Sequence, residues 1–344
     1  MPNNPFSLTF GKKPESLIDM IGTSDEIIEN FESENPPNQV YMITGVRGSG
    51  KTVLLTTVAN TFREEKDWVV VDLIPERDLL QALAAELSAK AELARIFKEA
   101  KLSISFLGVN LAIDGVAPIT DVVVALDRML EKLTNRGKKV LITIDEAISN
   151  DYIKIFASQF QVFLRKNYNV FLIMAGLHEN IRPLQDTDSL TFLYRAPRIE
   201  TKPLNLTLIS NKYQSIFNLS ENTATEMAKE TKGYPYAFQV LGYLCYKHKE
   251  QFQNVINEYY IYLVDYVYKK MWDELSKKDK SVLIAMSKTE SEKVEEIRKT
   301  AKMNSNQFNE YRKRLLDKGV IASKGHGYLE FTLPRFKEFV TESI

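Results

Sequence analysis

The sequence contains few of the residues that build disulfides and zinc sites. Its 344 residues include one cysteine and three histidines. The single cysteine, Cys245, excludes an intramolecular disulfide and is typical of a protein from the reducing cytoplasm. Its neighbours Leu241 and Leu244 are apolar, which favours a buried structural thiol over a reactive one. The histidines stand far apart in the sequence, so we expect no zinc site.

The chain also lacks an excess of charge and long apolar runs. Lysine plus arginine and aspartate plus glutamate each number 45. General attraction to nucleic acid or lipid is therefore excluded, and such binding would need a local patch. Apolar runs such as Val170–Leu177 are far shorter than the ~20 residues of a membrane span. Residues 1–10 lack the features of a signal peptide. We therefore expect a cytoplasmic protein without membrane association.

Four short apolar runs alternate with helical segments in the first 200 residues. These runs are Val40–Thr44, Trp68–Asp72, Lys139–Asp145 and Asn169–Ala175. Continuous apolar strands separated by helices predict an α/β fold with a parallel sheet covered on both faces. Between the second and third runs we expect helix over residues 76–100, a hairpin-like insertion over 101–116 and helix over 121–134.

The pattern changes after Pro203, where helix follows helix as far as Ser276. The last segment, residues 277–344, reads as three short helices, a hairpin around residues 324–327 and a closing helix. That order is typical of a winged helix-turn-helix. The sequence thus predicts three domains: a sheet domain with its N-terminal lead-in (1–203), a helical lid (204–276) and a winged helix (277–344).

A glycine-rich loop follows the first apolar run and opens a helix. Residues 45–52 read Gly-Val-Arg-Gly-Ser-Gly-Lys-Thr and fit the pattern G-x-x-x-x-G-K-[ST] in full. Glycines let backbone N–H groups surround phosphate oxygens, and the helix adds its positive end. Lys51 would reach the β- and γ-phosphates, and the Thr52 hydroxyl would bind Mg²⁺. The expected phosphate-site residues are Gly45, Val46, Arg47, Gly48, Ser49, Gly50, Lys51, Thr52 and Val53.

The third apolar run delivers two adjacent acids, Asp145 and Glu146, to the carboxyl edge of the sheet, where ligands bind in open α/β folds. Asp145 would hold Mg²⁺ through water. Glu146 would orient or deprotonate the attacking water. Asp145 and Thr52 are therefore the expected metal residues, and Lys51, Asp145 and Glu146 the expected catalytic ones.

The purine is expected to be adenine, with ATP and ADP as the ligands. A guanine-specific GTPase would need the purine-binding motif N-K-x-D. The nearest string in this sequence, Asn211-Lys-Tyr-Gln214, lacks the aspartate. Small-molecule kinases usually have no glutamate beside the metal-binding aspartate. The acidic pair therefore favours an ATPase.

Several strings together resemble the initiator-type and STAND-like branches of the AAA+ ATPases. The archaeal-type ATPases with a C-terminal winged helix look most similar. The matching strings are Asn4-Pro-Phe6, residues 45–55 and Phe171–Leu177. The resemblance implies that Ile21 and Gly22 line the adenine pocket, although Thr23 stands where the family has arginine. It also implies a polar sensor after the fourth strand, which here would be His178 or Asn180.

The resemblance further implies an arginine that neutralises the γ-phosphate. Arg195 is the first choice and Arg198 the second, acting in cis or across the interface of a homo-oligomer. Gly233-Tyr-Pro-Tyr236 is similar to the STAND lid motif. By that resemblance Pro235 would pack near the adenine or ribose, and Gly233 would permit close backbone approach.

The C-terminal segment is basic, although the whole chain is neutral. Residues 277–344 hold 15 lysines and arginines against 10 acids. A recognition helix is expected from Ser305, taken as its N-cap, to Asp317, with Phe308, Leu315 and Leu316 toward the core. The solvent-exposed side chains of this helix and of the wing would include Arg312, Arg314 and Lys324, which could contact double-stranded DNA. Winged helices also dock proteins, so a protein partner stays open.

The leading hypothesis is a slow ATPase that acts as a nucleotide-controlled switch coupled to the winged helix. An arginine sensor expected in the lid of the initiator branch is missing here, which favours a switch over a fast motor. The alternative is a DNA-binding regulator or replication-type loader in which the nucleotide is mainly structural. A signalling scaffold whose winged helix binds protein is the third.

Overall fold

The computed structural model describes residues 4–9, 15–16, 18, 23–106, 109–113 and 115–344. Their contacts divide the chain into two compact units. The first unit combines the described residues of the N-terminal segment up to residue 20 with the loop Gly45–Gly50 and with Thr201–Ile344. The second unit contains the described residues between residue 20 and the end of β1 at Thr44, together with Lys51–Glu200. The two units are described separately below.

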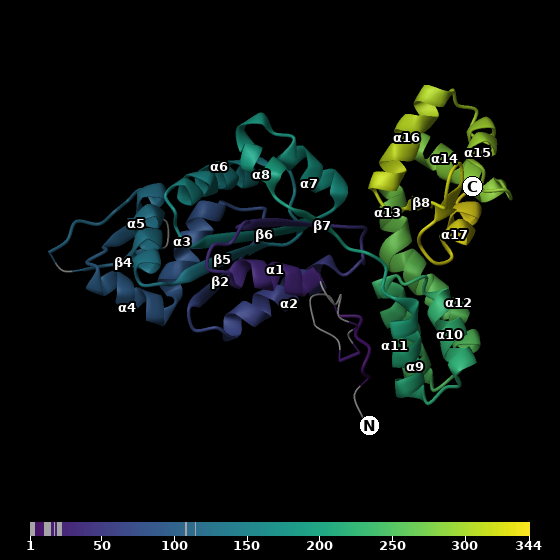
Figure 1. Cartoon of the computed structure of the whole chain (residues 1–344), viewed down its shortest axis with the longest axis horizontal. Helices are drawn as coiled ribbons and strands as arrows, with labels where there is room; N and C mark the ends of the chain where they lie inside the picture. The colour runs from purple at the N-terminus through teal and green to yellow at the C-terminus, as the bar shows by residue number, and fades with distance from the viewer. Residues whose placement is uncertain (1–3, 10–14, 17, 19–22, 107–108, 114) are drawn as a thin grey trace. The chain divides into compact units, whose positions relative to one another are not determined.

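The second unit is built on a five-stranded parallel sheet (Figure 1). Its strands are β1 (Val40–Thr44), β2 (Trp68–Leu73), β5 (Lys139–Ile144), β6 (Val170–Gly176) and β7 (Arg198–Glu200). Their order is β2-β5-β6-β1-β7. The strand that precedes the glycine-rich loop is therefore separated by β6 from the strand that precedes Asp145. All four strands expected from the apolar runs are confirmed.

Helices cover both faces of this sheet. They are α1 (Thr23–Glu32), α2 (Lys51–Glu64), α3 (Leu79–Ala89), α4 (Ala91–Glu99), α5 (Val122–Asn135), α6 (Asp151–Arg165), α7 (His178–Gln185) and α8 (Thr191–Arg195). Alternate residues of β1 belong to two separate hydrophobic clusters. Tyr41 and Ile43 pack with residues of α1 and α2. Val40 and Met42 pack in the cluster that contains residues of α3, α5 and α6. A strand covered on both faces must be apolar throughout, as predicted.

The region between β2 and β5 differs in one respect from the prediction. A single helix was expected over residues 76–100, but the backbone is extended at Lys90 (φ −75°, ψ 117°), which separates α3 from α4. The break lets Leu87 of α3 and Phe97 of α4 enter the same core. The expected insertion is an antiparallel hairpin of β3 (Ile104–Phe106) and β4 (Val109–Leu111).

The first unit is mostly helical. Its helices are α9 (Leu206–Phe217), α10 (Glu221–Glu230), α11 (Pro235–His248), α12 (Phe252–Leu263), a π-helical turn (Val264–Tyr268), α13 (Lys269–Asp273), α14 (Lys277–Lys288), α15 (Val294–Thr300), α16 (Ser305–Asp317) and α17 (Phe336–Glu342). Strands β8 (Ile321–Ser323) and β9 (Leu329–Phe331) form an antiparallel hairpin. The order from α14 to α17 agrees with the predicted winged-helix plan, as Figure 1 shows.

One hydrophobic cluster extends through this unit. It joins Phe238 of the lid helix α11 to Phe308 and Phe336 of the C-terminal segment. Tyr268, beside the predicted boundary at residue 276, lies with its ring centroid 4.9 Å from that of Phe336. The lid and the C-terminal segment therefore share a core. The predicted division into three domains stays a prediction.

The N-terminal lead-in packs with the lid, although the sequence assigned it to the sheet domain. The ring of Phe6 is buried and stacks on Phe217, with 5.7 Å between centroids. The Ser7 amide donates to Oε1 of Gln239 (3.1 Å), and the Asn4 side chain donates to the carbonyl of Tyr243 (3.2 Å). The position of this segment is therefore set by side chains of the lid that are far away in the sequence.

Candidate nucleotide site

The glycine-rich loop joins the end of β1 to the start of α2. Gly48 (φ 74°) and Gly50 (φ 90°) both adopt the left-handed backbone region that side chains with a Cβ rarely occupy. At Gly48 a Cβ would also lie 2.2 Å from the hydroxyl of Tyr234. Backbone conformation and a close neighbour therefore both require glycine at this position.

Within the first unit, the lid contacts the loop through two backbone carbonyls. The Tyr234 hydroxyl donates to the carbonyl of Arg47 (2.5 Å), and the Tyr236 amide donates to the carbonyl of Gly48 (3.2 Å). Burial raises the pKa of the Tyr236 phenol to about 12 and raises that of Tyr234 further, so both phenols are neutral at physiological pH. The two tyrosines that flank Pro235 thus hold the loop, a role that the sequence did not predict.

Two side chains of the loop have partners in the same unit. The Arg47 guanidinium forms an ion pair with Glu274, with 2.9 Å between Nη2 and Oε1. The hydroxyls of Ser49 and Thr201 lie 2.6 Å apart. Neither Glu274 nor Thr201 belongs to a sequence motif, so sequence reasoning could not identify them. The loop is therefore fixed by residues 152 and 227 positions away.

Pro235 and Gly233 have local structural roles. Pro235 is the first residue of α11 and is half-buried. Proline is favoured there because that position has no helical acceptor for an amide. Gly233 has φ 74°, and a Cβ there would lie 2.5 Å from the carbonyl oxygen of Leu204. The close approach predicted for Gly233 is thus an approach to backbone, and contact of Pro235 with a nucleotide stays a prediction.

The structure joins the two predicted metal residues within the second unit. The Thr52 hydroxyl donates to Oδ2 of Asp145 (2.7 Å), although 93 positions separate the residues. The other carboxylate oxygen, Oδ1, accepts from the amide of Glu146 (2.9 Å). A hydroxyl and a carboxylate are oxygen donors of the type that Mg²⁺ prefers. The pair therefore fits the predicted ion by its chemistry.

Glu146 lies in a strained turn after β5. Its φ of 51° is in the left-handed region, which costs a non-glycine residue about 1 kcal/mol. The next amide, of Ala147, donates to the carbonyl of Ala175 on β6 (2.8 Å), which fixes the turn. The Glu146 side chain is exposed. Strain of this kind clusters at functional sites, so it supports the predicted catalytic role.

The two predicted arginines lie on other elements than this pair. Arg195 ends α8, Arg198 begins β7, and both are exposed. Within the described part of the chain neither forms an ion pair or a hydrogen bond with Thr52, Asp145 or Glu146. The candidate sensors, His178 and Asn180, are half-buried in the first turn of α7. Val53 is half-buried in α2. Ile21 and Gly22 lie outside the described residues.

The predicted DNA-contacting residues have a different environment from the one expected. Arg314 is half-buried and pairs with Asp279, whose side chain is 2% exposed, with 2.7 Å between Nη2 and Oδ2. Lys324 pairs with Glu292 at 3.1 Å. Arg312 is half-buried, and its Nε is buried without a hydrogen-bond partner. Arg312 and Arg314 are therefore partly rather than fully exposed, and 40% of the Arg314 side-chain surface remains accessible.

The helix expected over Ser305–Asp317 is confirmed, with a correction at its start, whereas its role in recognition stays a prediction. The cap is Asn304, whose side chain accepts from the amide of Gln307 (2.9 Å), whereas Ser305 was expected. As predicted, Phe308 and Leu315 are buried.

Cys245 is buried in α11, and burial raises the pKa of its thiol to about 12. At pH 8 roughly one molecule in 10⁴ would carry a thiolate, compared with roughly one in four for a free cysteine. We expect the folded protein to react with a chromogenic disulfide at least about 100-fold more slowly than the urea-unfolded protein. Equal rates by absorbance would show that the lid opens readily.

Across the described ranges, no group of three or more His, Cys, Asp or Glu side chains is arranged to hold a metal ion. None of the helices in these ranges has the length and apolarity needed to cross a bilayer.

Comparison with known proteins gives a family and a fold. A family model described as an ATPase domain predominantly from Archaea matches residues 26–236. A model of a domain of unknown function matches residues 265–340. No curated protein matches the sequence.

Three solved structures are similar over nearly the whole chain. A Walker-type ATPase of Pyrococcus abyssi is 17% identical, with 97% of this chain and 99% of that chain covered and a TM-score of 0.69. The ORC2 protein of Aeropyrum pernix, in ADPNP–ADP complexes, is 12% identical, with 97% and 95% covered and a TM-score of 0.60. Cdc6p of Pyrobaculum aerophilum is 14% identical, with 99% and 97% covered and a TM-score of 0.50. At these identities the likeness shows the fold.

Proposed function

Because the chain belongs to the family of ATPase domains found predominantly in Archaea, we propose that it binds ATP with Mg²⁺ through residues 45–52 and hydrolyses it slowly. The observation that carries this proposal is the hydrogen bond of 2.7 Å between Thr52 and Asp145. It joins the end of the phosphate motif to the acid after β5, as a Mg²⁺-dependent hydrolytic centre requires.

Each residue has a role that its chemistry supports. The loop amides and the Lys51 ammonium would bind the phosphates. Thr52 and Asp145 would hold Mg²⁺, which when bound supplies charge neutralisation. Glu146 would orient the attacking water and accept its proton. Arg195, or else Arg198, would neutralise the γ-phosphate, in cis or from a second copy of the chain, and exposure of both side chains is compatible with either arrangement.

The direct test is nucleotide binding and turnover by the purified full-length chain. Calorimetry with ATP, ADP and GTP, each with and without Mg²⁺, should show adenine preference and tighter binding with the ion. Phosphate release should be slow but measurable. A folded sample without affinity for adenine nucleotides would contradict the proposal. Tight ADP retention without any turnover would favour the alternative, a DNA-binding regulator or loader with a structural nucleotide.

We further propose that the loop reports its state to the C-terminal segment through Arg47. Its partner Glu274 follows α13, and two positions later Ser276 caps α14 in a capping box with Asp279. Asp279 in turn pairs with Arg314 on α16, which also donates to the Ser276 hydroxyl (2.7 Å). Two sets of polar contacts, joined by the short segment 274–276, therefore lie between the phosphate loop and the predicted recognition helix.

The Arg47–Glu274 pair is suited to switching because it is weak. Both side chains are about one third exposed, and pairs of that kind contribute about 0–1 kcal/mol. A bound triphosphate that changes the loop could therefore exchange this contact for another at little cost. The lid and α16 would then respond together, because they share one core.

We expect ATP to change the hydrogen-exchange protection of α16 in the wild type, and Glu274→Gln to abolish that change. ATP affinity should stay within about threefold, since Glu274 touches the loop through a surface-type ion pair. The matched control is Asp265→Asn, which removes an exposed pair with Lys269 and should leave the response intact. A full response in Glu274→Gln would show that the signal takes another route.

A further inference from the structure

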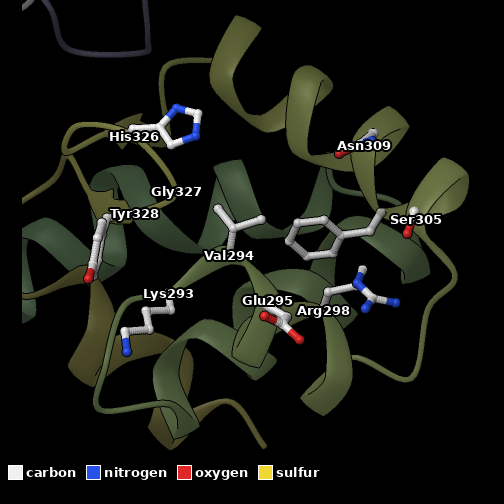
Figure 2. Close-up of a pocket in the computed structure, with 10 residues that line it drawn as sticks. Lys293, Val294, Glu295, Arg298, Ser305, Asn309, His326, Gly327 and Tyr328 are labelled. Atoms are coloured by element: carbon white, nitrogen blue, oxygen red, sulfur yellow. The ribbon is translucent and has the colours of Figure 1, made fainter.

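The C-terminal segment contains a pocket of about 420 Å³ that the nucleotide proposal does not use. We call it the wing pocket. Its lining includes Lys293, Arg298, Phe308, Asn309, His326 and Tyr328. These residues come from α15 and the residue before it, from the start of α16 and from the turn between β8 and β9. Figure 2 shows His326 and Tyr328 on one side, Arg298, Ser305 and Asn309 on the other, and Val294 between them.

The floor of the wing pocket is apolar. Phe308 is fully buried and Val294 half-buried, and both pack in the core of the unit. Tyr328 remains 38% exposed beside them. A hollow of this volume with an apolar floor accepts a side chain or a small ligand. An anchoring aromatic or aliphatic side chain is the feature that such pockets recognise in partner proteins.

The wing pocket also holds two cationic groups, which lie near the Glu295 carboxylate and contribute, after Lys299, to the lowering of its pKa. Among the described residues, Lys293 and Arg298 form no ion pair, and His326 adds a ring that can exchange hydrogen bonds. Arg298 makes one long contact, to the carbonyl of Met303 (3.4 Å). Glu295, a carboxylate in the lining, is already neutralised by Lys299, with 2.8 Å between Oε1 and Nζ. The net electrostatic character of the pocket is therefore positive and suits an anionic ligand.

The outward face of α16 is a poor match for a nucleic-acid duplex. Its exposed side chains are Ser305, Asn306, Gln307, Asn309, Glu310 and Lys313. The charges of Glu310 and Lys313 cancel, so this face has no net charge. Binding of a duplex depends on cations that neutralise successive phosphates. Arg314 and Lys324 already have carboxylate partners. Two cations that form no ion pair with any described residue, Lys293 and Arg298, instead line a concave, side-chain-sized site.

We propose that the wing pocket docks an acidic segment of a partner protein. One apolar side chain of that segment inserts against Val294 and Tyr328, the apolar lining residues that keep exposed surface. Flanking carboxylates face Lys293 and Arg298, where charge-assisted hydrogen bonds give both orientation and affinity. This docking does not require a bound nucleotide, so it is independent of the ATPase proposal.

The test uses the full-length chain and two pools of short labelled peptides. In the first pool a leucine, phenylalanine or tryptophan lies among glutamates, and in the second the glutamates are replaced by glutamines. We expect salt-sensitive binding of the acidic pool by fluorescence anisotropy, and at least about tenfold weaker binding of the neutral pool. Absence of that preference would overturn the proposal.

Variants identify the site. Lys293→Gln and Arg298→Gln should each weaken binding of the acidic peptides about tenfold. Lys293 is exposed, so its variant should fold even if loss of Arg298 disturbs the α15–α16 turn. The matched control is Lys313→Gln, on the outward face of α16, which should leave peptide binding unchanged. Lys51→Ala should also bind the peptides normally, which separates this result from a failure of the ATPase proposal.

A short DNA duplex provides the opposing outcome. If duplex binding is strong and falls in Lys293→Gln and Arg298→Gln, while the peptides do not compete, the pocket contacts nucleic acid and the proposal is wrong. Duplex binding that responds only to Lys313→Gln, with peptide binding lost in the two pocket variants, would support it.

Discussion

Glu146→Gln is expected to abolish most ATP turnover while it preserves ATP binding. Glutamine has the shape of glutamate but cannot accept a proton from water, and removal of a general base typically costs 10²–10⁴-fold. We therefore expect phosphate release to fall by at least about 100-fold, with the dissociation constant for ATP within about threefold of the wild type. The left-handed backbone at Glu146 should tolerate the change equally well, because both side chains branch beyond Cβ.

The matched control for this variant is Glu86→Gln, which removes the same charge from an exposed position on α3. It should hydrolyse ATP at the wild-type rate. Normal turnover by Glu146→Gln would assign the water-activating role to another group. Loss of ATP binding together with turnover would instead indicate that the turn after β5 is disturbed, and circular dichroism would detect that.

Lys51→Ala is expected to remove nearly all ATP binding. Each charge-assisted hydrogen bond from the ammonium to phosphate is worth about 1.5–3 kcal/mol, so loss of the group should raise the dissociation constant at least about 100-fold. Lys51→Arg should recover only part of the affinity, because a planar guanidinium does not replace a compact ammonium between two phosphates. Calorimetry with Mg²⁺ and ATP measures both effects.

Lys66→Ala is the matched control, because Lys66 is exposed just beyond the end of α2. Its ATP affinity should equal that of the wild type. If Lys51→Ala binds ATP normally, residues 45–52 do not form the phosphate site, and the proposed function loses its basis. The thermal midpoint of Lys51→Ala should stay near the wild-type value, since the lysine begins a helix and does not enter a core.

Much of the fold followed from local patterns. Strands buried on both faces have uninterrupted apolar sequences, and the four runs predicted from that rule are strands in the structure. The break between α3 and α4 was missed because the sequence around Lys90 has high helix propensity throughout. There, the geometry of a shared core outweighed propensity and forced an extended residue.

The environment of charged side chains was the least predictable feature. Arg314 has the same spacing as a solvent-facing residue, yet it neutralises the buried Asp279. The pairing of Arg314 with the buried Asp279 depends on how α16 packs on α14, and helical periodicity alone does not predict that packing. The wing pocket is likewise lined by residues from α15, α16 and the β8–β9 turn, which only the tertiary structure brings together.

The sequence by itself determined the nature of the phosphate motif, the order of the strands along the chain and the acids after β5, because glycine spacing and apolar runs act locally. Only the tertiary structure decided which residues hold the motif in place. Tyr234, Thr201 and Glu274 reach the loop across 187, 152 and 227 positions. Such contacts depend on the fold as a whole, so no local pattern encodes them.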